Sequence, residues 1–201
     1  MAAEHFGRNG YDDTKWADVA TVVGIGSTAL YHYFESKQHS LYEIMARSVA
    51  SFQARFDGIV STHDDFRDAI VAVLVDSFDL TESEVLQLRV VAAEQGLVAV
   101  PSKSPREEEA RLDARSRMRD LEFAWGIFLT RGMEQGAIPK TDPKLLARSV
   151  LGLYNSVWHW YRPRGPVSLA DVSRFFIARQ LTVLGLSPEL AARASAEKSA
   201  R

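Results

Sequence analysis

Apolar side chains recur every three or four positions along almost the whole chain, which is the spacing of one face of an α-helix. We find no strand-like alternation of apolar and polar residues, and Asn9-Gly10 fits a left-handed helix end better than a hairpin turn. The pattern therefore predicts an all-α fold with about nine helices. The expected helices lie near residues 1–8, 15–22, 27–34, 37–57, 64–79, 82–97, 104–135, 142–162 and 168–184.

Several of these helices carry capping signals at their first residues. Thr81-Glu82-Ser83-Glu84 and Ser104-Pro105-Arg106-Glu107 both fit the capping box, in which a hydroxyl and a carboxylate satisfy free amide groups. Asp142-Pro143 and Ser168, three residues before Asp171, mark two more helix starts. The breaks between helices are expected at Gly136, Pro139, Pro163, Gly165 and Pro166.

The segment from Trp16 to Tyr33 has the spacing of a helix-turn-helix. Ala20 is a small residue where two helix backbones would approach, and Gly24 suits the left-handed residue of the turn. Apolar residues around them are expected to pack the second helix against the first. This apolar set is Val19, Val23, Ile25, Leu30 and Tyr33.

Polar side chains on the remaining face of this segment can contact DNA, because hydroxyls and a tyrosine can bond phosphates or base edges. Ser36 is expected to cap the next helix, whose first amides and Lys37 could receive a phosphate, and Thr14 could cap in the same way before Lys15. A small helical subdomain with a polar surface would fit the same spacing. The residues expected at the DNA interface are Thr14, Lys15, Ser27, Thr28, Tyr31, His32 and Lys37.

The first quarter of the chain resembles the N-terminal signature of TetR-family regulators. The resemblance is carried by Phe6-Gly7-Arg8-Asn9-Gly10-Tyr11, by Thr14, by Val19-Ala20-Thr21-Val22-Val23-Gly24-Ile25, and by Ala29-Leu30-Tyr31-His32-Tyr33-Phe34-Glu35-Ser36-Lys37. It implies a homodimer that reads a palindromic operator in double-stranded DNA, and a small-molecule effector that releases it. In the family, the positions of Thr14, Ser27, Thr28, Tyr31, His32 and Lys37 commonly touch DNA.

Two departures from the family pattern bear on DNA binding. The chain begins near the middle of the family's usual first helix, so we expect that helix to be truncated. Gly26 and Ser27 stand where a capping Ser and a Lys or Arg are frequent, which removes one cationic contact per subunit. An alternative is therefore a dimeric small-molecule-binding helical protein with weakened or lost DNA binding.

The resemblance implies a helix-turn-helix domain at residues 1–48, a helical-bundle ligand-binding and dimerisation domain at 49–186, and a polar tail at 187–201. Dense aromatic residues in the larger domain suit a cavity for an apolar ligand with a few polar handles, although each would also serve as core. The expected pocket residues are Gln95, Phe123, Trp125, Phe128, Tyr154, Asn155, Trp158 and His159.

The segment from Trp158 to Pro166 is similar to one in TetR-type regulators of steroid and fatty-acid catabolism, which respond to acyl-CoA thioesters. That similarity implies a CoA ester as the effector. Arg162 or Arg164 would then meet CoA phosphates, since guanidinium groups suit phosphate oxygens. The alternative for these two arginines is a solvated pair at a helix end.

The last two expected helices carry apolar residues on more than one side, which usually means that a partner covers one of them. The resemblance implies that they pair with their symmetry mates in a four-helix bundle. Packing within a single chain could also use these residues. The expected dimer interface comprises Val150, Leu153, Val157, Tyr161, Phe175, Arg179 and Val183.

Composition narrows the function classes. Of the 201 residues, 46% are hydrophobic and 25% charged, and no apolar run approaches the ~18 residues of a membrane span, so we expect no membrane partner. The absence of cysteine removes disulfides and thiolate sites and suits the cytoplasm. The net charge is −2, and the first fifty residues hold four basic and six acidic side chains, so DNA contact must depend on local placement.

The sequence offers no constellation for catalysis. The five histidines show no metal-ligand spacing, and neither a Gly-rich phosphate loop nor a Gly-x-Ser-x-Gly elbow is present. We therefore expect no catalytic residue, no metal and no cofactor, and we interpret the chain as a ligand-responsive transcriptional repressor rather than an enzyme.

Overall fold

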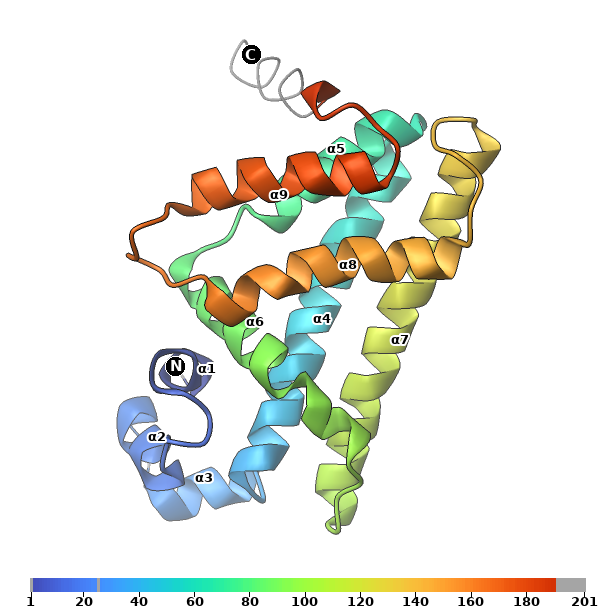
Figure 1. Ribbon diagram of the computed structural model, residues 1–201. Helices are drawn as coiled ribbons and strands as arrows, with labels where there is room; N and C mark the ends of the chain where they lie inside the picture. Colours follow the sequence, from blue (N-terminus) through green and yellow to red (C-terminus); the bar gives the residue numbers. More distant parts are fainter. Residues whose placement is uncertain (1, 25, 191–201) are drawn as a thin grey trace. The chain divides into compact units, whose positions relative to one another are not determined.

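The computed structural model describes residues 2–24 and 26–190, except for the side chains of Ala2, Val22 and Ser27. Within those residues it contains nine α-helices, one short 3₁₀ helix and no strand, which confirms the all-α prediction (Figure 1). The α-helices are α1 (Ala2–Asn9), α2 (Trp16–Val23), α3 (Ser27–Tyr33), α4 (Lys37–Thr62), α5 (Phe66–Ser77), α6 (Glu82–Glu94), α7 (Pro105–Glu134), α8 (Pro143–Trp160) and α9 (Leu169–Val183), and the 3₁₀ helix is η1 (Gln95–Ala99).

Local capping fixes several helix starts as the sequence predicts. Thr81 and Glu84 form the reciprocal capping box of α6, and Asp142 and Ser168 cap α8 and α9. The capping box expected at α7 is wrong, because the amide of Ser104 donates to the hydroxyl of Ser102 at 3.4 Å and Glu107 accepts the hydroxyls of Ser36 and Ser102 instead. Two ends also differ from expectation, since α4 continues to Thr62 and α6 gives way to η1 after Glu94.

Contacts divide the chain into two compact units, each built from two segments. The first unit contains residues up to Ser51 together with Thr81–Arg119, and the second contains Phe52–Leu80 and the chain from Asp120 onward. The functional division expected from the sequence, 1–48 and 49–186, stays a prediction. The expected tail at 187–201 lies outside the described residues from residue 191 onward.

In the first unit, the N-terminal helices share one hydrophobic core with α6 and the first part of α7. Glycine at position 7 permits the close approach of α1 to α6, because a Cβ there would lie 2.5 Å from the carbonyl oxygen of Leu86. Arg89 of α6 also donates to the carbonyl of Gly7 at 3.3 Å. The buried core residues are Phe6, Val19, Ala20, Leu30, Leu41, Tyr42, Met45, Ala46, Val90, Ala110 and Ala114.

The helix-turn-helix predicted from Ala20 and Gly24 is present in α2 and α3. Gly24 has φ 77° and ends α2 in the left-handed conformation, in which an L side chain would be strained. Ala20 and Leu30 are buried between the two helices as expected. Tyr33 is a correction, because its side chain is 68% exposed and Phe34, just past the helix end, packs against Trp16 in its place. Ile25 lies outside the described residues.

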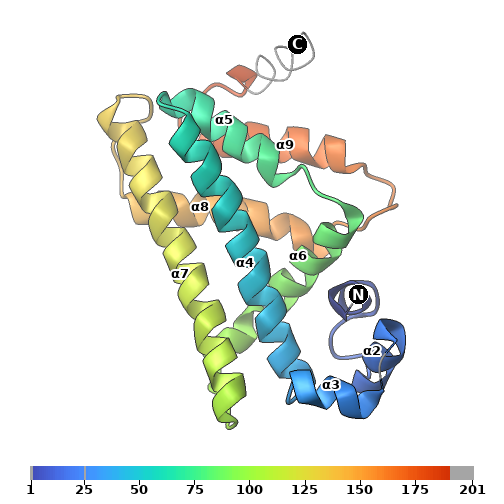
Figure 2. The same ribbon diagram turned by 180° about the vertical axis from the view of Figure 1, so that it is seen from behind.

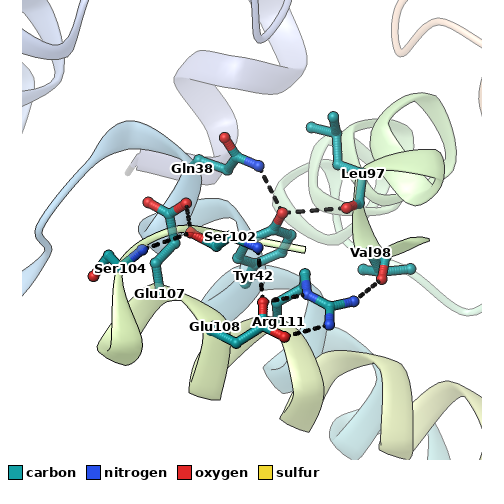
Figure 3. Close-up of polar contacts among 9 residues, drawn as sticks. All are labelled: Gln38, Tyr42, Leu97, Val98, Ser102, Ser104, Glu107, Glu108 and Arg111. Carbon is teal, nitrogen blue, oxygen red and sulfur yellow. Dashed lines mark hydrogen bonds and ion pairs between the residues drawn. The ribbon is translucent and has the colours of Figure 1, made fainter. Parts of the chain in front are cut away.

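Side chains of α4 hold the segment between α6 and α7, residues 95–104. The Tyr42 hydroxyl donates to the carbonyl oxygen of Leu97 at 3.2 Å, and Gln38 donates its amide N–H to the same hydroxyl at 2.6 Å (Figure 3). Burial raises the pKa of Tyr42, so the hydroxyl stays protonated and remains a donor at neutral pH.

The first two turns of α7 fix the same segment from its other end. Buried Arg111 donates to the carboxylate of Glu108, with Nε at 2.7 Å, and to the carbonyl of Val98 (Figure 3). The amide of Ser102 also donates to Glu108 at 2.8 Å. These hydrogen bonds, with that from Arg111 the largest cause, lower the pKa of Glu108 from 4.5 to about 2.

In the second unit, α8 and α9 lie side by side, and α5 packs beside α9 (Figures 1 and 2). The buried amide of Gln180 on α9 donates to the carbonyl of Val150 on α8 at 3.1 Å. The hydroxyl of Tyr154 donates to the carbonyl of Ser77 at the end of α5 at 3.0 Å. Among the described residues, none of the helices is both long and apolar enough to cross a membrane.

We predict that Gly7→Ala destabilises the fold by about 1–3 kcal/mol, because the new methyl group overpacks the contact with Leu86. Gly58→Ala is the matched control, since a Cβ at this helical glycine of α4 meets nothing within 4 Å. The control is expected to gain roughly 0.5–1 kcal/mol from helix propensity alone. Urea unfolding of both variants measures the difference, and equal midpoints would contradict the close contact.

Candidate functional site

The outer face of α3 carries three of the residues expected at a DNA interface. Thr28, Tyr31 and His32 are exposed, with 54% of the Tyr31 side chain accessible. Their spacing of three and four positions places them on one side of the helix. The side chain of Ser27 lies outside the described residues. The face thus presents a hydroxyl, a phenol and an imidazole, each of which can bond a phosphate or a base edge.

Tyr33 is an exposed aromatic residue at the C-terminal end of α3 that the pattern reasoning assigned to the core. The assignment rested on the spacing of the apolar residues, whereas Phe34, where the backbone becomes extended, supplies the ring that packs against Trp16. The sequence signal that could have found Tyr33 is the pair Tyr33-Phe34, in which only one ring can fill the single core position.

Thr14 and Lys15 precede α2, and the structure places them differently. Lys15 is exposed and is the N-cap residue of α2, which has no side-chain cap. Thr14 is buried and donates its hydroxyl to the carbonyl oxygen of Gly10 at 2.6 Å. The expectation that Thr14 caps α2 is therefore wrong, because the hydroxyl closes the turn before the helix instead.

The start of α4 is closed by its own side chains. Ser36 accepts a hydrogen bond from the amide of His39 at 2.9 Å, as its predicted role of helix cap requires, and donates its hydroxyl to Glu107. The ammonium group of Lys37 lies 2.7 Å from the carbonyl oxygen of Tyr11 and 3.1 Å from that of Thr14. Lys37 thus contacts the turn before α2.

Two carboxylates lie near the end of α3. Glu35 follows the helix in the chain, and Glu107 of α7 contacts Ser36. Glu35 accepts the hydroxyl of Ser104 and lies 3.9 Å from the guanidinium group of Arg106. Glu107 accepts the hydroxyls of Ser36 and Ser102. Arg106 therefore offsets part of the negative charge of Glu35, whereas the neutral hydroxyls on Glu107 leave its charge in place.

Four of the residues expected in a ligand pocket are buried in the second unit, in two groups of aromatic rings. The stacked rings of Phe56 and Trp125 have centroids 5.2 Å apart, and Tyr154 meets Trp158 edge to face at 5.3 Å. The ring contacts form two groups, which are together named here the aromatic cluster. The first group is Phe56, Phe66, Trp125 and Phe128, and the second is Phe52, Phe78, Tyr154, Trp158 and Tyr161.

The other expected pocket residues lie outside this cluster. Phe123 is 72% exposed, and Asn155 and His159 are exposed on α8. Gln95 belongs to η1 in the first unit. The indole N–H groups of Trp125 and Trp158 are buried without a hydrogen-bond partner, so the polar handles that the structure brings into the cluster are indoles rather than the expected amide and imidazole.

The expected dimer residues divide by helix. Val150, Val157 and Tyr161 are buried within the single chain and Leu153 is half-buried, so the α8 members serve the core of their own subunit. On α9, Phe175, Arg179 and Val183 follow one another at spacings of four residues. All three are exposed, and the guanidinium group of Arg179 lies 4.4 Å above the ring of Phe175. These three residues are named here the α9 face.

The part of the chain that the structure describes contains no candidate metal site. No group of three or more His, Asp or Glu side chains there could hold a metal ion.

Two known protein families match this chain, one in its N-terminal part and one in its C-terminal part. A family described as "Bacterial regulatory proteins, tetR family" matches residues 1–41, and one described as "Tetracyclin repressor-like, C-terminal domain" matches residues 79–184. The HTH-type transcriptional repressor KstR2 of Mycobacterium tuberculosis is 28% identical over 183 residues, which cover 89% of this chain and 86% of that protein.

Solved structures of similar chains have the same fold. The TetR family transcriptional regulator PfmR from Thermus thermophilus is 28% identical with a TM-score of 0.72, covering 92% of this chain and 95% of that one. The ketosteroid transcriptional regulator KstR2 of Mycobacterium tuberculosis is 27% identical with a TM-score of 0.71, covering 92% and 90%. The helix-turn-helix, the helical C-terminal region and these matches show that the chain belongs to the TetR family of bacterial transcriptional regulators.

Proposed function

We propose that this TetR-family regulator represses transcription from a palindromic operator and leaves it when a small, largely apolar effector binds. The observation that carries the proposal is the exposed face of Thr28, Tyr31 and His32 on the second helix of the helix-turn-helix. TetR-family regulators bind DNA as dimers and are transcription factors rather than enzymes. We expect the protein to act without catalysis in the cytoplasm, where its operator lies.

DNA reading would use two copies of α3 related by the dimer axis. Each α3 enters a major groove, and the two half-sites lie about one helical turn apart, which is ~34–36 Å. Tyr31 and His32 contact base edges or phosphates, and Lys15 at the start of α2 adds a cation beside the backbone. Exposed Tyr33 extends the same surface beyond the residues expected from the sequence.

The α9 face is the proposed dimer contact. Phe175 and Val183 are exposed apolar side chains on the helix that packs beside α8, and Arg179 covers part of the Phe175 ring. Pairing α8 and α9 with their symmetry mates would bury this face in a four-helix bundle. The buried α8 residues Val150 and Val157 would support the bundle from inside each subunit.

An acyl-CoA thioester is the proposed effector class. Support comes from the similarity of the segment Trp158–Pro166 to acyl-CoA-responsive regulators and from the relative described as a ketosteroid transcriptional regulator. The apolar part of the ligand would lie among the rings of the aromatic cluster, and a buried indole N–H group, that of Trp125 in one ring group or that of Trp158 in the other, would donate to its carbonyl oxygen. Arg162 donates to the carbonyls of His159 and Tyr161, which favours the helix-end role for that arginine over a CoA contact.

Release from DNA would follow from a population shift. The effector binds one dimer conformation better than the other, and in the favoured one the two copies of α3 no longer match successive major grooves. α4 and α7 each contribute residues to both compact units as one continuous helix. Because α4 begins four residues after α3, we expect effector binding to act on α3 through α4.

We predict that Tyr31→Ala weakens binding to the operator by tenfold or more, because the dimer loses one DNA contact from each of its two copies of α3, and each is typically worth about 1–3 kcal/mol. Leu112→Ala removes an exposed side chain of α7 outside this face and serves as the matched control. Fluorescence anisotropy with the upstream intergenic DNA of the gene at low salt measures both. Specific binding that survives Tyr31→Ala would refute the reading face, and no specific binding by the unaltered chain would favour the ligand-binding protein without DNA recognition.

A second prediction concerns the dimer. Phe175→Glu replaces a large apolar side chain of the α9 face by a carboxylate, and we expect it to convert the dimer to a folded monomer because burying that charge carries a desolvation cost even with Arg179 beside it. Leu112→Glu, which introduces the same charge at an exposed apolar position on α7, should leave the dimer intact. Sedimentation velocity reports the mass of each variant. If Phe175→Glu remains a dimer, the dimer interface is not the α9 face.

A third prediction concerns the effector. Acyl-CoA thioesters should raise the melting temperature, with a gain of about 2.7 kcal/mol at a free concentration one hundred times Kd, and should release the operator. Trp158→Phe, which keeps a ring and removes the N–H, should weaken this shift, whereas Trp160→Phe at a largely exposed position should not. Free CoA is the ligand control. No shift with acyl-CoAs of several chain lengths would exclude the class.

A further inference from the structure

The ammonium group of Lys37 lies inside a ring of backbone carbonyls. Its Nζ atom is 2.7 Å from the carbonyl oxygen of Tyr11, 3.1 Å from that of Thr14 and 3.4 Å from that of Asp12. The same atom lies 4.2 Å from the centre of the Tyr11 ring. All three acceptors belong to the turn between α1 and α2, whereas Lys37 is the first residue of α4.

This arrangement uses the full donor capacity of the side chain. A lysine ammonium has three N–H donors and no acceptor, and three carbonyl oxygens stand within hydrogen-bond distance of it. The face of the Tyr11 ring adds a cation–π attraction. A DNA phosphate would therefore have to compete with partners that the folded chain already supplies.

The turn that Lys37 holds is otherwise closed by a few local hydrogen bonds. Thr14 donates its hydroxyl to Gly10 and its amide to the carbonyl of Tyr11 at 3.3 Å. Gly10 has φ 90°, so the chain leaves α1 in a left-handed conformation before it turns into α2. The Tyr11 ring packs edge to face on Phe6 of the core at 5.4 Å.

The two ends that Lys37 joins bracket the reading helices. The turn leads directly into α2, and Lys37 follows α3 by four residues. The hydrogen bonds from Lys37 to the turn before α2 therefore join the two ends of the helix-turn-helix segment. The direction of α3 relative to α4 then depends on these bonds as well as on the apolar core.

We propose that Lys37 is a positioning residue for DNA reading, which fixes the helix-turn-helix to α4 through the carbonyls of Tyr11, Asp12 and Thr14, and is not a phosphate contact. This departs from the DNA contact expected at Lys37 from the sequence. The changes that this proposal predicts in operator affinity rest on the proposed function, whereas the changes that it predicts in melting temperature and amide exchange do not.

The two roles predict different responses to substitution. Loss of a phosphate contact reduces the slope of log K against log salt by about 0.9 per phosphate, which is about 1.8 for a dimer, and leaves stability unchanged. Loss of a positioning contact lowers affinity at every salt concentration with the slope unchanged, and lowers the melting temperature. Arginine suits a phosphate but not three convergent carbonyls, because its donors form a planar fork.

The test compares Lys37→Met, which keeps the apolar stem, with Lys37→Arg and with Lys15→Met. Lys15 is exposed at the start of α2 and is the matched cation for a phosphate role. Operator binding is measured by anisotropy at several salt concentrations, at a temperature where every variant is fully folded. Melting temperature and amide exchange of residues 10–15 are measured without DNA.

We expect Lys37→Met to melt at a lower temperature, to exchange the amides of residues 10–15 faster, and to bind the operator on the order of tenfold more weakly with an unchanged salt slope. Lys37→Arg should not restore affinity. Lys15→Met should show the opposite pattern, with a smaller slope and an unchanged melting temperature.

Three results would overturn the proposal. One is a reduced salt slope in Lys37→Met with full rescue by arginine, which identifies a phosphate contact. Another is a lower melting temperature with unchanged affinity, which identifies a purely structural residue. The third is an unchanged melting temperature and unchanged amide exchange in Lys37→Met, which overturns the proposal whether or not the unaltered chain binds an operator. If the unaltered chain binds no operator, that result by itself refutes only the proposed function.

Discussion

The close packing of α1 on α6 is the contact on which the first unit depends. A single missing Cβ at position 7 lets the backbone of Leu86 approach, and the apolar side chains of α2 and α3 then share their core with α6 and α7. The hydrogen-bonded turn before α2, the left-handed Gly24 and the capped start of α4 act within that frame. The outer face of α3, with Thr28, Tyr31 and His32, is exposed because the opposite side of the helix, at Leu30, packs into this core.

Much of the fold could be predicted because the signals are local. The hydrophobic period indicated the helices, and the caps at Thr81, Asp142 and Ser168 lie within three residues of the groups that they satisfy. The prediction failed where a side chain found a distant partner. Ser104 and Glu107 were expected to cap one helix, yet Ser104 bonds Glu35 and Glu107 bonds Ser36, 69 and 71 positions away. No periodic pattern encodes such a choice.

In the candidate site, too, features with a local sequence signal could be predicted and contacts with distant partners could not. Thr28, Tyr31 and His32 could be predicted because helix spacing determines which side they share. The partners of Thr14 and Lys37 are backbone carbonyls in a turn, and carbonyl positions have no signature in side-chain identity. In the second unit, aromatic content predicted a cluster but could not show that Phe123 lies outside it, because its apolar character is compatible with either side of α7.

The two-segment composition of the first unit has a consequence for exchanging parts between regulators. The chain leaves this unit after Ser51 and returns at Thr81, and Val90, Ala110 and Ala114 complete the core beneath the reading helices. A graft that carried only the first fifty residues into another scaffold would expose one side of that core. A working chimera therefore needs α6 and the first turns of α7 from the same parent as α1 to α3, because the unit that contains the helix-turn-helix is built from two stretches of the sequence rather than one.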